Sequence, residues 1–228
     1  MDLGLTGAKT VVQGGTKGMG RAAAECFAAE GAKVAVLART QADIDAAVGR
    51  LFKLGAADAL GLRADVTDQA QVEAAFHQVR DRWGELNILV NAAGPTVAGG
   101  FEDLSDEDWL AAIDQAALGM IRCVRAALPL LRTAEWARIV NIAAISTRRQ
   151  VPALVAYTAA KAMVTSVTKN LSQSLAKEEI LVNTVSPGAF VTTGMTQLMK
   201  TAGVDPADLY GVMRVIGERY GHESHMPR

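Results

Sequence analysis

The sequence predicts an α/β protein whose single, doubly wound parallel sheet carries helices on both faces. Short runs rich in Val and Ile alternate with longer, Ala-rich amphipathic segments, which is the pattern of repeated strand–helix–strand units. Hydrophobic residues make up 50% of the 228 positions, enough for a substantial core. No Pro/Ser-rich linker, repeat or low-complexity tract interrupts the alternation, so we expect one domain over residues 1–228.

Six apolar runs predict the strands, at residues 9–13, 33–38, 57–63, 88–92, 138–142 and 180–186. The Ala-rich segments between them predict five helices, at residues 18–30, 41–54, 68–83, 105–131 and 155–177. Gly31 and Gly55 follow the first two helices, where a left-handed residue commonly ends a helix. The pairs Thr67-Asp68 and Ser105-Asp106 offer side-chain caps at the starts of the next two. Each helix therefore joins two strands, as a parallel sheet requires.

The overall charge argues against several classes of partner. The 23 Lys and Arg residues nearly balance the 24 Asp and Glu residues, which gives a net charge of −1. Such a chain attracts neither nucleic acid nor an anionic membrane, so we expect a small-molecule partner. The N-terminus lacks a basic region followed by an apolar run, and no apolar stretch reaches about 18 residues. We expect a cytoplasmic protein with no membrane partner.

The thiols and imidazoles indicate neither a disulfide framework nor a metal site. Cys26 and Cys123 are isolated in the sequence, and we expect both to be buried helix residues. His77, His222 and His225 have no spacing typical of metal ligands within a structured element. The sequence therefore predicts no metal.

The segment between the first predicted strand and the first predicted helix is rich in glycine, with the spacing Gly14-x3-Gly18-x-Gly20. Glycines at such a turn let the backbone approach a pyrophosphate closely, and the unpaired N–H groups of the following helix hold its charge. The segment therefore predicts a dinucleotide site. Its predicted contacts come from Gly14, Thr16, Lys17, Gly18, Met19 and Gly20.

The end of the second predicted strand bears on which dinucleotide is bound. An NAD enzyme usually presents a carboxylate there to the ribose 2′-hydroxyl, whereas a 2′-phosphate requires a cation. Arg39 can make a forked contact to phosphate, and Lys17 can add a second positive charge. The pair favours NADP(H) over NAD(H); the alternative is that both side chains are solvated surface residues.

Tyr157 and Lys161 stand four residues apart, on one face of the last predicted helix. They are accompanied in order by the glycine turn, by Asn91-Ala92-Ala93-Gly94, by Ile139-Val140-Asn141-Ile142 and by Asn183-Thr184-Val185-Ser186-Pro187-Gly188. On these motifs, which cover nearly the whole chain, the sequence resembles the short-chain dehydrogenase/reductase family. Gln13 departs from the pattern, because the family commonly has Thr there.

The resemblance implies an NAD(P)-binding, Rossmann-type domain that reduces a carbonyl, or oxidises a secondary alcohol, by hydride transfer. Tyr157 would be the acid/base, with the Lys161 ammonium favouring its phenolate, and Lys161 would also hold the nicotinamide ribose. By the same resemblance, Asp65 and Val66 would contact the adenine. The other implied cofactor contacts are Asn91, Ala92, Ala93, Gly94, Pro187, Gly188 and Thr192.

Two residues expected from the family are missing. A Ser normally lies thirteen positions before the Tyr, and this sequence has Ala144 there. The helix Asn that completes the usual tetrad falls on Ala116. The Ser normally donates a hydrogen bond to the substrate oxygen, and losing such a donor costs on the order of 10²–10³ in rate.

Three alternatives stay open. Ser146 lies two residues beyond Ala144, so it would point to the same face if the strand conformation persists; Thr147 is a weaker candidate. The substrate could instead carry its own activating group, which would leave Tyr157 and Lys161 sufficient. In the third alternative the protein binds the nucleotide with little or no redox activity, as a sensor, a scaffold or a non-redox enzyme.

The C-terminal part of the sequence bears on substrate and assembly. Residues 189–210 contain several apolar side chains, which favours a small apolar substrate, with the apolar face of a lid helix as the alternative. Family members usually continue through another helix and a seventh strand, whereas this sequence stops at Arg228, either as a natural short form or as an incomplete chain. By resemblance, helices 105–131 and 155–177 would form the interface of a homodimer or homotetramer.

Overall fold

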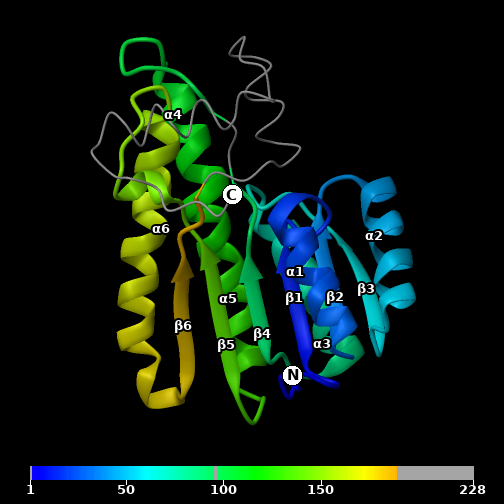
Figure 1. The fold of residues 1–228 in the computed structure, drawn as a ribbon. Coiled ribbons are helices and arrows are strands. Elements are labelled where there is room, and N and C mark those ends of the chain that lie inside the picture. Colours follow the sequence, from blue (N-terminus) through cyan, green and yellow to red (C-terminus); the bar gives the residue numbers. More distant parts are fainter. Residues whose placement is uncertain (1, 95–96, 189–228) are drawn as a thin grey trace, which may run out of the picture. The chain divides into compact units, whose positions relative to one another are not determined.

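The computed structural model, which describes residues 2–94 and 97–188, is built on one parallel sheet (Figure 1). The strand order is β3-β2-β1-β4-β5-β6, so the direction of winding reverses between β1 and β4. This order confirms the predicted doubly wound α/β class. The strands are β1 (Lys9–Gln13), β2 (Lys33–Ala38), β3 (Asp58–Arg63), β4 (Ile88–Asn91), β5 (Ala137–Ile142) and β6 (Ile180–Val185).

The register of the strands brings their carboxyl ends to one edge. Gln13 at the end of β1 pairs with Asn91 at the end of β4, and Asn91 pairs in turn with Asn141 of β5. In open α/β sheets, ligands bind beyond this edge, at the point where the winding reverses. The loops that follow β1, β4 and β5 are therefore the expected place for a site.

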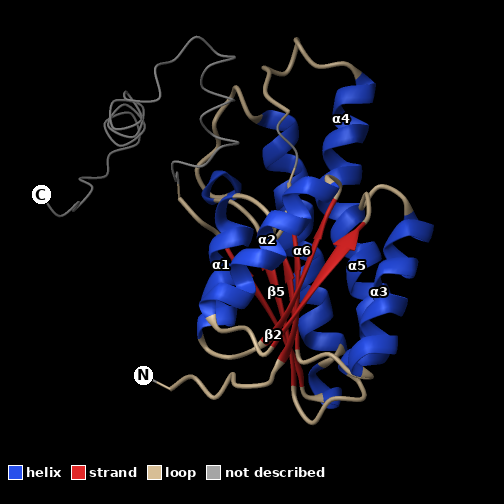
Figure 2. Ribbon diagram, turned by 90° about the vertical axis from the view of Figure 1, so that its right-hand side faces the viewer, coloured by secondary structure: helices blue, strands red, loops and turns tan. Residues whose placement is uncertain are grey.

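The helices form a layer on each face of the sheet (Figure 2). On one face, Val12 and Val36 pack in a core with α1 (Gly18–Ala29) and α2 (Gln41–Leu54). On the other, Val11 and Leu37 pack in a core with α3 (Gln69–Trp83), α5 (Gly119–Leu131) and α6 (Val155–Ser174). The alternation of side chains along each strand thus supplies both cores, which explains the continuous apolar runs in the sequence.

Helix ends follow the predicted chemistry. The carboxylate of Asp68 accepts a hydrogen bond from the Gln71 N–H at the start of α3. Ser105 and Asp108 form a reciprocal capping box at the start of α4 (Asp106–Ile113). Gly31 and Gly55 have φ of +74° and +104°, the left-handed conformation expected after a helix.

The predicted helix 105–131 is not continuous, and this part of the prediction was wrong. A π-helix, η1 (Asp114–Leu118), separates α4 from α5. A π-turn inserts one extra residue into a run of helix-forming side chains, so the composition gives no sign of it. At its end Gly119 lies against Val66, and a Cβ on Gly119 would come within 2.7 Å of the Val66 Cγ2. The widened turn therefore sits where the helix approaches the loop after β3.

Two further expectations need correction or a limit. Cys26 is exposed, because it lies on the face of α1 turned away from the buried residues Ala24 and Ala28; Cys123 is buried as expected. Residues 1–187 form one unit, and only Gly188 of the second unit, residues 188–228, is described, so the single domain stays a prediction. In the part of the chain that is described, no helix is both long enough and apolar enough to span a membrane.

Candidate active site

The glycine-rich turn between β1 and α1 packs against the end of β4. Gly14 has φ of +76°, and a Cβ there would come within 2.7 Å of the Ala93 backbone nitrogen. A Cβ on Gly20 would come within 2.3 Å of the Gly14 carbonyl oxygen. Both positions therefore require glycine for the turn to lie this close to residues 92 and 93.

The start of α1 is free to hold an anion. Lys17 occupies the N-cap without a side-chain cap, and the first turn contains no acidic residue. The first N–H groups of a helix have no intrahelical acceptor, and the helix dipole adds positive charge at this end. The glycine cradle and the uncapped helix start therefore fit the pyrophosphate of a dinucleotide.

Gln13 ties this turn to the loop after β4, a role that the sequence did not reveal. Its side chain is buried, and its Oε1 accepts a hydrogen bond from the Ala93 N–H at 2.9 Å. The only signal in the sequence was the departure from the family's Thr. Gln13 thus supplies a side-chain acceptor at this position.

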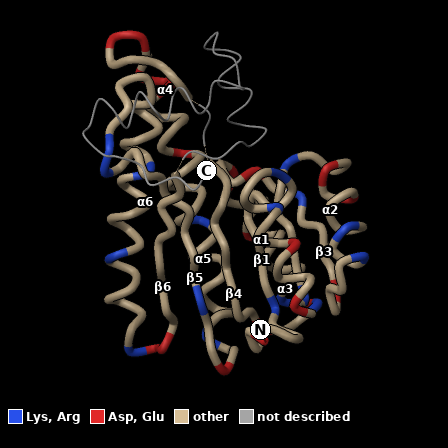
Figure 3. The backbone as a smooth tube through the Cα atoms, in the orientation of Figure 1, with Lys and Arg blue, Asp and Glu red and all other residues tan. Residues whose placement is uncertain are grey.

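The two predicted cations follow β1 and β2, Lys17 at the start of α1 and Arg39 directly after β2. Basic and acidic residues both occur near α1 and α2 (Figure 3). The Lys17 Nζ lies 2.7 Å from the Asp43 Oδ2, at the start of α2. The Arg39 guanidinium lies 4.0 Å from Asp65, whose Oδ1 also accepts hydrogen bonds from Thr67. Each predicted phosphate contact therefore has an acidic neighbour, and Asp43 was not recognised from the sequence.

Tyr157 and Lys161 lie together near the start of α6, as their spacing predicts. The Lys161 Nζ donates a hydrogen bond to the Ile142 carbonyl at the end of β5, at 2.7 Å, and lies 5.9 Å from the centroid of the Tyr157 ring. Lys161 is only 3% exposed, and this burial lowers its pKa to about 8. Burial also raises the pKa of the Tyr157 hydroxyl above its ordinary value.

Gly94 leaves room for the Lys161 ammonium. A Cβ on Gly94 would come within 3.0 Å of the Lys161 Nζ and 3.2 Å of its Cε. The loop after β4 therefore contacts the glycine turn through Ala93 and lies beside the Tyr157–Lys161 pair through Gly94. These contacts bring the predicted cofactor residues of β1, β4 and α6 to one edge of the sheet.

A buried polar chain holds β4, β5 and α6 in place behind this edge. The Asn91 Nδ2 donates to the Asn141 Oδ1 at 2.8 Å, and the Asn141 Nδ2 donates to the Thr168 Oγ1 at 2.9 Å. Thr168 lies two turns beyond Lys161 on α6 and donates to the Val164 carbonyl. Ile142 follows Asn141 directly. These side-chain hydrogen bonds therefore help to fix the Ile142 carbonyl, which accepts the hydrogen bond from the Lys161 ammonium.

The premise for Ser146 as a replacement hydroxyl does not hold. β5 ends at Ile142, and the 3-10 helix η2 (Ile145–Thr147) begins directly after Ala144, so strand alternation does not extend to Ser146. Ser146 is 4% exposed, and its Oγ has no hydrogen-bond partner among the described residues. Ala116 lies buried inside the π-helix η1. Positions 144 and 116 thus hold buried Ala side chains in place of the Ser and Asn expected from the family.

The remaining predicted contacts lie on both sides of this centre. At Val66, a predicted adenine contact, the backbone carbonyl accepts a hydrogen bond from Arg122 of α5 at 3.0 Å, which fixes the loop after β3. On the nicotinamide side, the Pro187 carbonyl accepts from the Ile145 N–H at 2.9 Å, so the segment after β6 lies against η2. Gly188 is described and exposed, whereas Thr192 lies outside the described residues.

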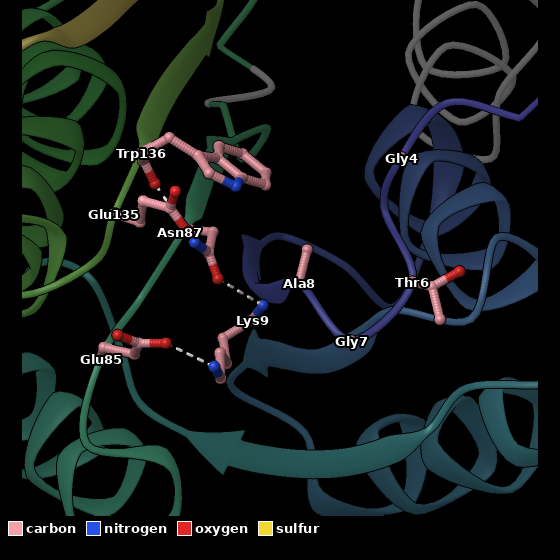
Figure 4. A pocket seen from close by; sticks show the side chains of 9 residues that line it. All are labelled: Gly4, Thr6, Gly7, Ala8, Lys9, Glu85, Asn87, Glu135 and Trp136. Atoms are coloured by element: carbon pink, nitrogen blue, oxygen red, sulfur yellow. Dashed lines mark hydrogen bonds and ion pairs between the residues drawn. The ribbon is translucent and has the colours of Figure 1, made fainter.

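A polar cavity of about 310 Å³ lies at the opposite end of the sheet, before β1, β4 and β5 (Figure 4). Its polar groups already bind one another. Lys9 pairs with Glu85, and the Asn87 side chain accepts from the Lys9 N–H and donates to the Trp136 carbonyl. The cavity lies at the amino ends of the strands, away from Tyr157, and we do not assign the site to it.

Comparison with known proteins connects this site to a family. Residues 8–202 match the family described as short chain dehydrogenase. The chain is 33% identical to a 3-oxoacyl-[acyl-carrier-protein] reductase of Synechocystis, over 85% of this chain and 78% of the relative. L-Sorbose reductase of Gluconobacter frateurii, solved with NADPH and L-sorbose, shares 27% identity with a TM-score of 0.87, over 96% of this chain and 84% of that structure. A NAD+-bound xylitol dehydrogenase shares 25% identity with a TM-score of 0.77, over 81% of this chain and 71% of that structure.

Proposed function

The chain belongs to the short-chain dehydrogenase family of oxidoreductases, and from that premise we propose that it reduces a carbonyl compound with NADPH. The observation that carries the proposal is the placement of Tyr157 and Lys161 beside the glycine cradle, at the carboxyl edge of the sheet. The 3-oxoacyl reductase relative and the NADPH-bound sorbose reductase support a carbonyl as the group that is reduced.

The chemistry requires a proton donor at the carbonyl oxygen, and Tyr157 supplies it in the proposal. The bound cofactor would supply a hydride to the carbonyl carbon. The Tyr157 hydroxyl donates its proton to the oxygen, and the product is an alcohol. A Tyr hydroxyl ordinarily keeps its proton at neutral pH, and burial raises the pKa of Tyr157 further, so the hydroxyl is available as the proton donor.

Lys161 holds the cofactor in this proposal. An ammonium has three N–H donors, and the Ile142 carbonyl uses one of them in this structure. The others are available for the hydroxyls of the nicotinamide ribose. The ammonium also favours the phenolate of Tyr157 after proton transfer, because a positive charge nearby stabilises an anion.

The proposed preference for NADP(H) over NAD(H) rests on Arg39 and Lys17. Both side chains are exposed at the carboxyl ends of the strands, at 72% and 61% of their surface. A 2′-phosphate would meet two cations there. The solved relatives include both an NADPH complex and a NAD+ complex, so the preference is argued from these residues and not from the fold.

The missing Ser and Asn define the second candidate function. The methyl side chains of Ala144 and Ala116 cannot form a hydrogen bond to a substrate oxygen or to a water, and Ser146 is buried. A protein with these residues could bind the nucleotide and reduce carbonyls slowly or not at all. We favour slow reduction, with a substrate that carries its own donor beside the carbonyl, because the Tyr157–Lys161 pair and its supports are intact.

The test is NADPH oxidation, followed by absorbance, with a panel of 3-oxoacyl thioesters, keto sugars, cyclic ketones, aldehydes and quinones. We expect turnover with at least one member, and loss of that turnover in Tyr157→Phe. The Ser146→Ala variant in the same assay tests whether that hydroxyl contributes. Normal binding of NADPH without turnover across the panel would favour the nucleotide-binding protein instead.

We also propose that the chain forms a homodimer or homotetramer through residues 105–131, which include α4, η1 and α5, and residues 155–177, which include α6. Light scattering on the protein as it elutes from a size-exclusion column measures the mass of the assembly directly. A monomer at working concentrations would contradict this proposal.

A further inference from the structure

We propose that Asp43 limits the affinity for NADPH by competing with the cofactor 2′-phosphate for Lys17. This inference rests on the proposed NADP(H) function and adds a residue that sets its selectivity. The Asp43 Oδ2 lies 2.7 Å from the Lys17 Nζ, within the range of a charge-assisted hydrogen bond. Lys17 is therefore already engaged by an anion from the protein.

Arg39, the second predicted phosphate contact, is paired less closely with an acidic residue than Lys17 is. Arg39 lies 4.0 Å from Asp65 and is 72% exposed, so it is held weakly. Asp65 also accepts hydrogen bonds from the Thr67 N–H and hydroxyl through its Oδ1. Arg39 can therefore turn to a phosphate without breaking a close contact, whereas Lys17 must leave Asp43 or be shared with it.

Charge makes the competition specific for the 2′-phosphate. A phosphate monoester carries nearly two negative charges at neutral pH, and Asp43 adds a third close to Lys17. A 2′-hydroxyl carries no charge, so NADH binding depends much less than NADPH binding on releasing Lys17 from Asp43. Asp43 should therefore weaken NADPH binding and leave NADH binding almost unchanged.

The position of Asp43 explains why the chain tolerates this opposing charge. Asp43 lies in the first turn of α2, where a carboxylate is favoured by the helix dipole. The N-cap residue Thr40 forms no side-chain cap, and Asp43 is the acidic residue of the first turn. The carboxylate therefore has a structural role in the cofactor-free protein and an opposing one in the complex.

The experiment compares the wild type with Asp43→Asn and with the matched control Asp45→Asn. Asp45 lies on the same helix and accepts a hydrogen bond from Gln41, but it pairs with no cation among the described residues. The dissociation constants of NADPH and NADH are measured by fluorescence at low and high salt. The same measurements in a Lys17→Met background show whether the effect passes through Lys17.

We expect Asp43→Asn to tighten NADPH binding about threefold to tenfold at low salt, with less than about a twofold change for NADH. High salt should reduce the gain, Asp45→Asn should show none, and Lys17→Met should remove most of it. Unchanged or weaker NADPH binding in Asp43→Asn, or an equal gain in the Lys17→Met background, would overturn the inference alone. A wild type that binds neither cofactor would overturn the proposed function as well.

Discussion

Single residues decide whether this site can work, and the loop after β4 shows how closely they are fitted. Gly94 has no Cβ, and the space beside it is taken by the end of the Lys161 side chain. Lys161 in turn is placed by one hydrogen bond to the Ile142 carbonyl. The position of the Lys161 ammonium therefore depends both on the lack of a side chain at Gly94 and on the hydrogen bond to Ile142.

Replacing Gly94 with Ala should lower kcat/KM by up to about tenfold while the fold is kept. The new Cβ would lie 3.0 Å from the Lys161 Nζ, so the flexible end of that side chain must shift by a few tenths of an ångström relative to Tyr157. NADPH turnover and thermal unfolding measure the two effects. The matched control is Gly49→Ala, on an exposed position of α2 with open space around it, which should stabilise by about 0.5–1 kcal/mol. Full activity in Gly94→Ala would contradict the proposed role of the Lys161 position.

The burial of Lys161 predicts a dependence of stability on pH. Its pKa is about 8 in the folded protein and 10.5 as the ordinary value, so the unfolded chain binds more protons between these pH values. The free energy of unfolding should therefore rise as the pH increases from about 8 toward 10. The raised pKa of Tyr157 acts in the opposite direction, but only above its ordinary value of 10.

The measurement is urea unfolding of the cofactor-free wild type and Lys161→Met across this pH range. Met has a similar length and no charge, so the difference between the two proteins isolates the contribution of Lys161. We expect the difference in unfolding free energy to change by about 1–3 kcal/mol. A difference that stays constant with pH would show that the ammonium is solvated.

At the scale of elements, the site depends on how β1, β4, β5 and α6 are tied together at the carboxyl edge of the sheet. Gln13 joins the glycine turn to the loop after β4, and Asn141 joins β5 to Thr168 on α6. Both side chains are buried, so each unpaired group that a substitution leaves behind carries a desolvation cost. These ties hold the predicted cofactor residues of separate elements close together.

Replacing Gln13 with Met should destabilise the protein by about 1–3 kcal/mol and weaken NADPH binding. Met keeps the length of the side chain but cannot accept the hydrogen bond from the Ala93 N–H, which then lacks a partner. Denaturant unfolding and cofactor titration give the two values. Gln69→Met is the control and should change little, because Gln69 is an exposed residue of α3 whose side chain bonds only to Glu73 among the described residues. Unaltered NADPH affinity in Gln13→Met would mean that the turn keeps its shape without this tie.

The elements themselves were largely predictable from the sequence, and the reasons differ from one to the next. β1 and β2 match the predicted ranges, because a short apolar run bounded by glycines and turns is too short for a helix and predicts a buried strand. The cap at Asp68 and the capping box at Ser105 were readable because their chemistry is local. The π-helix η1 was not, because its one extra residue lies within a run of helix-forming side chains and leaves no mark in the composition.

At the scale of the whole molecule, only the parts of the site that belong to local sequence motifs could be predicted. Tyr157, Lys161 and the glycine turn lie at one edge of the sheet because parallel strands end there. The contacts between distant segments were not readable: Gln13 with Ala93 and Lys17 with Asp43 join residues that no spacing rule relates. The replacement role of Ser146 rested on strand alternation, which stops where β5 gives way to η2.

The central claim is that Tyr157 donates a proton to a carbonyl that receives hydride, although Ala144 and Ala116 stand in the usual Ser and Asn positions. The most direct measurement uses NADPH deuterated at the transferred position and analyses the product by mass spectrometry. The claim predicts an alcohol carrying one deuterium with the wild type and none above background with Tyr157→Phe. A wild type that binds NADPH yet labels no carbonyl in the panel, or a Tyr157→Phe variant that labels as fast as the wild type, would contradict it.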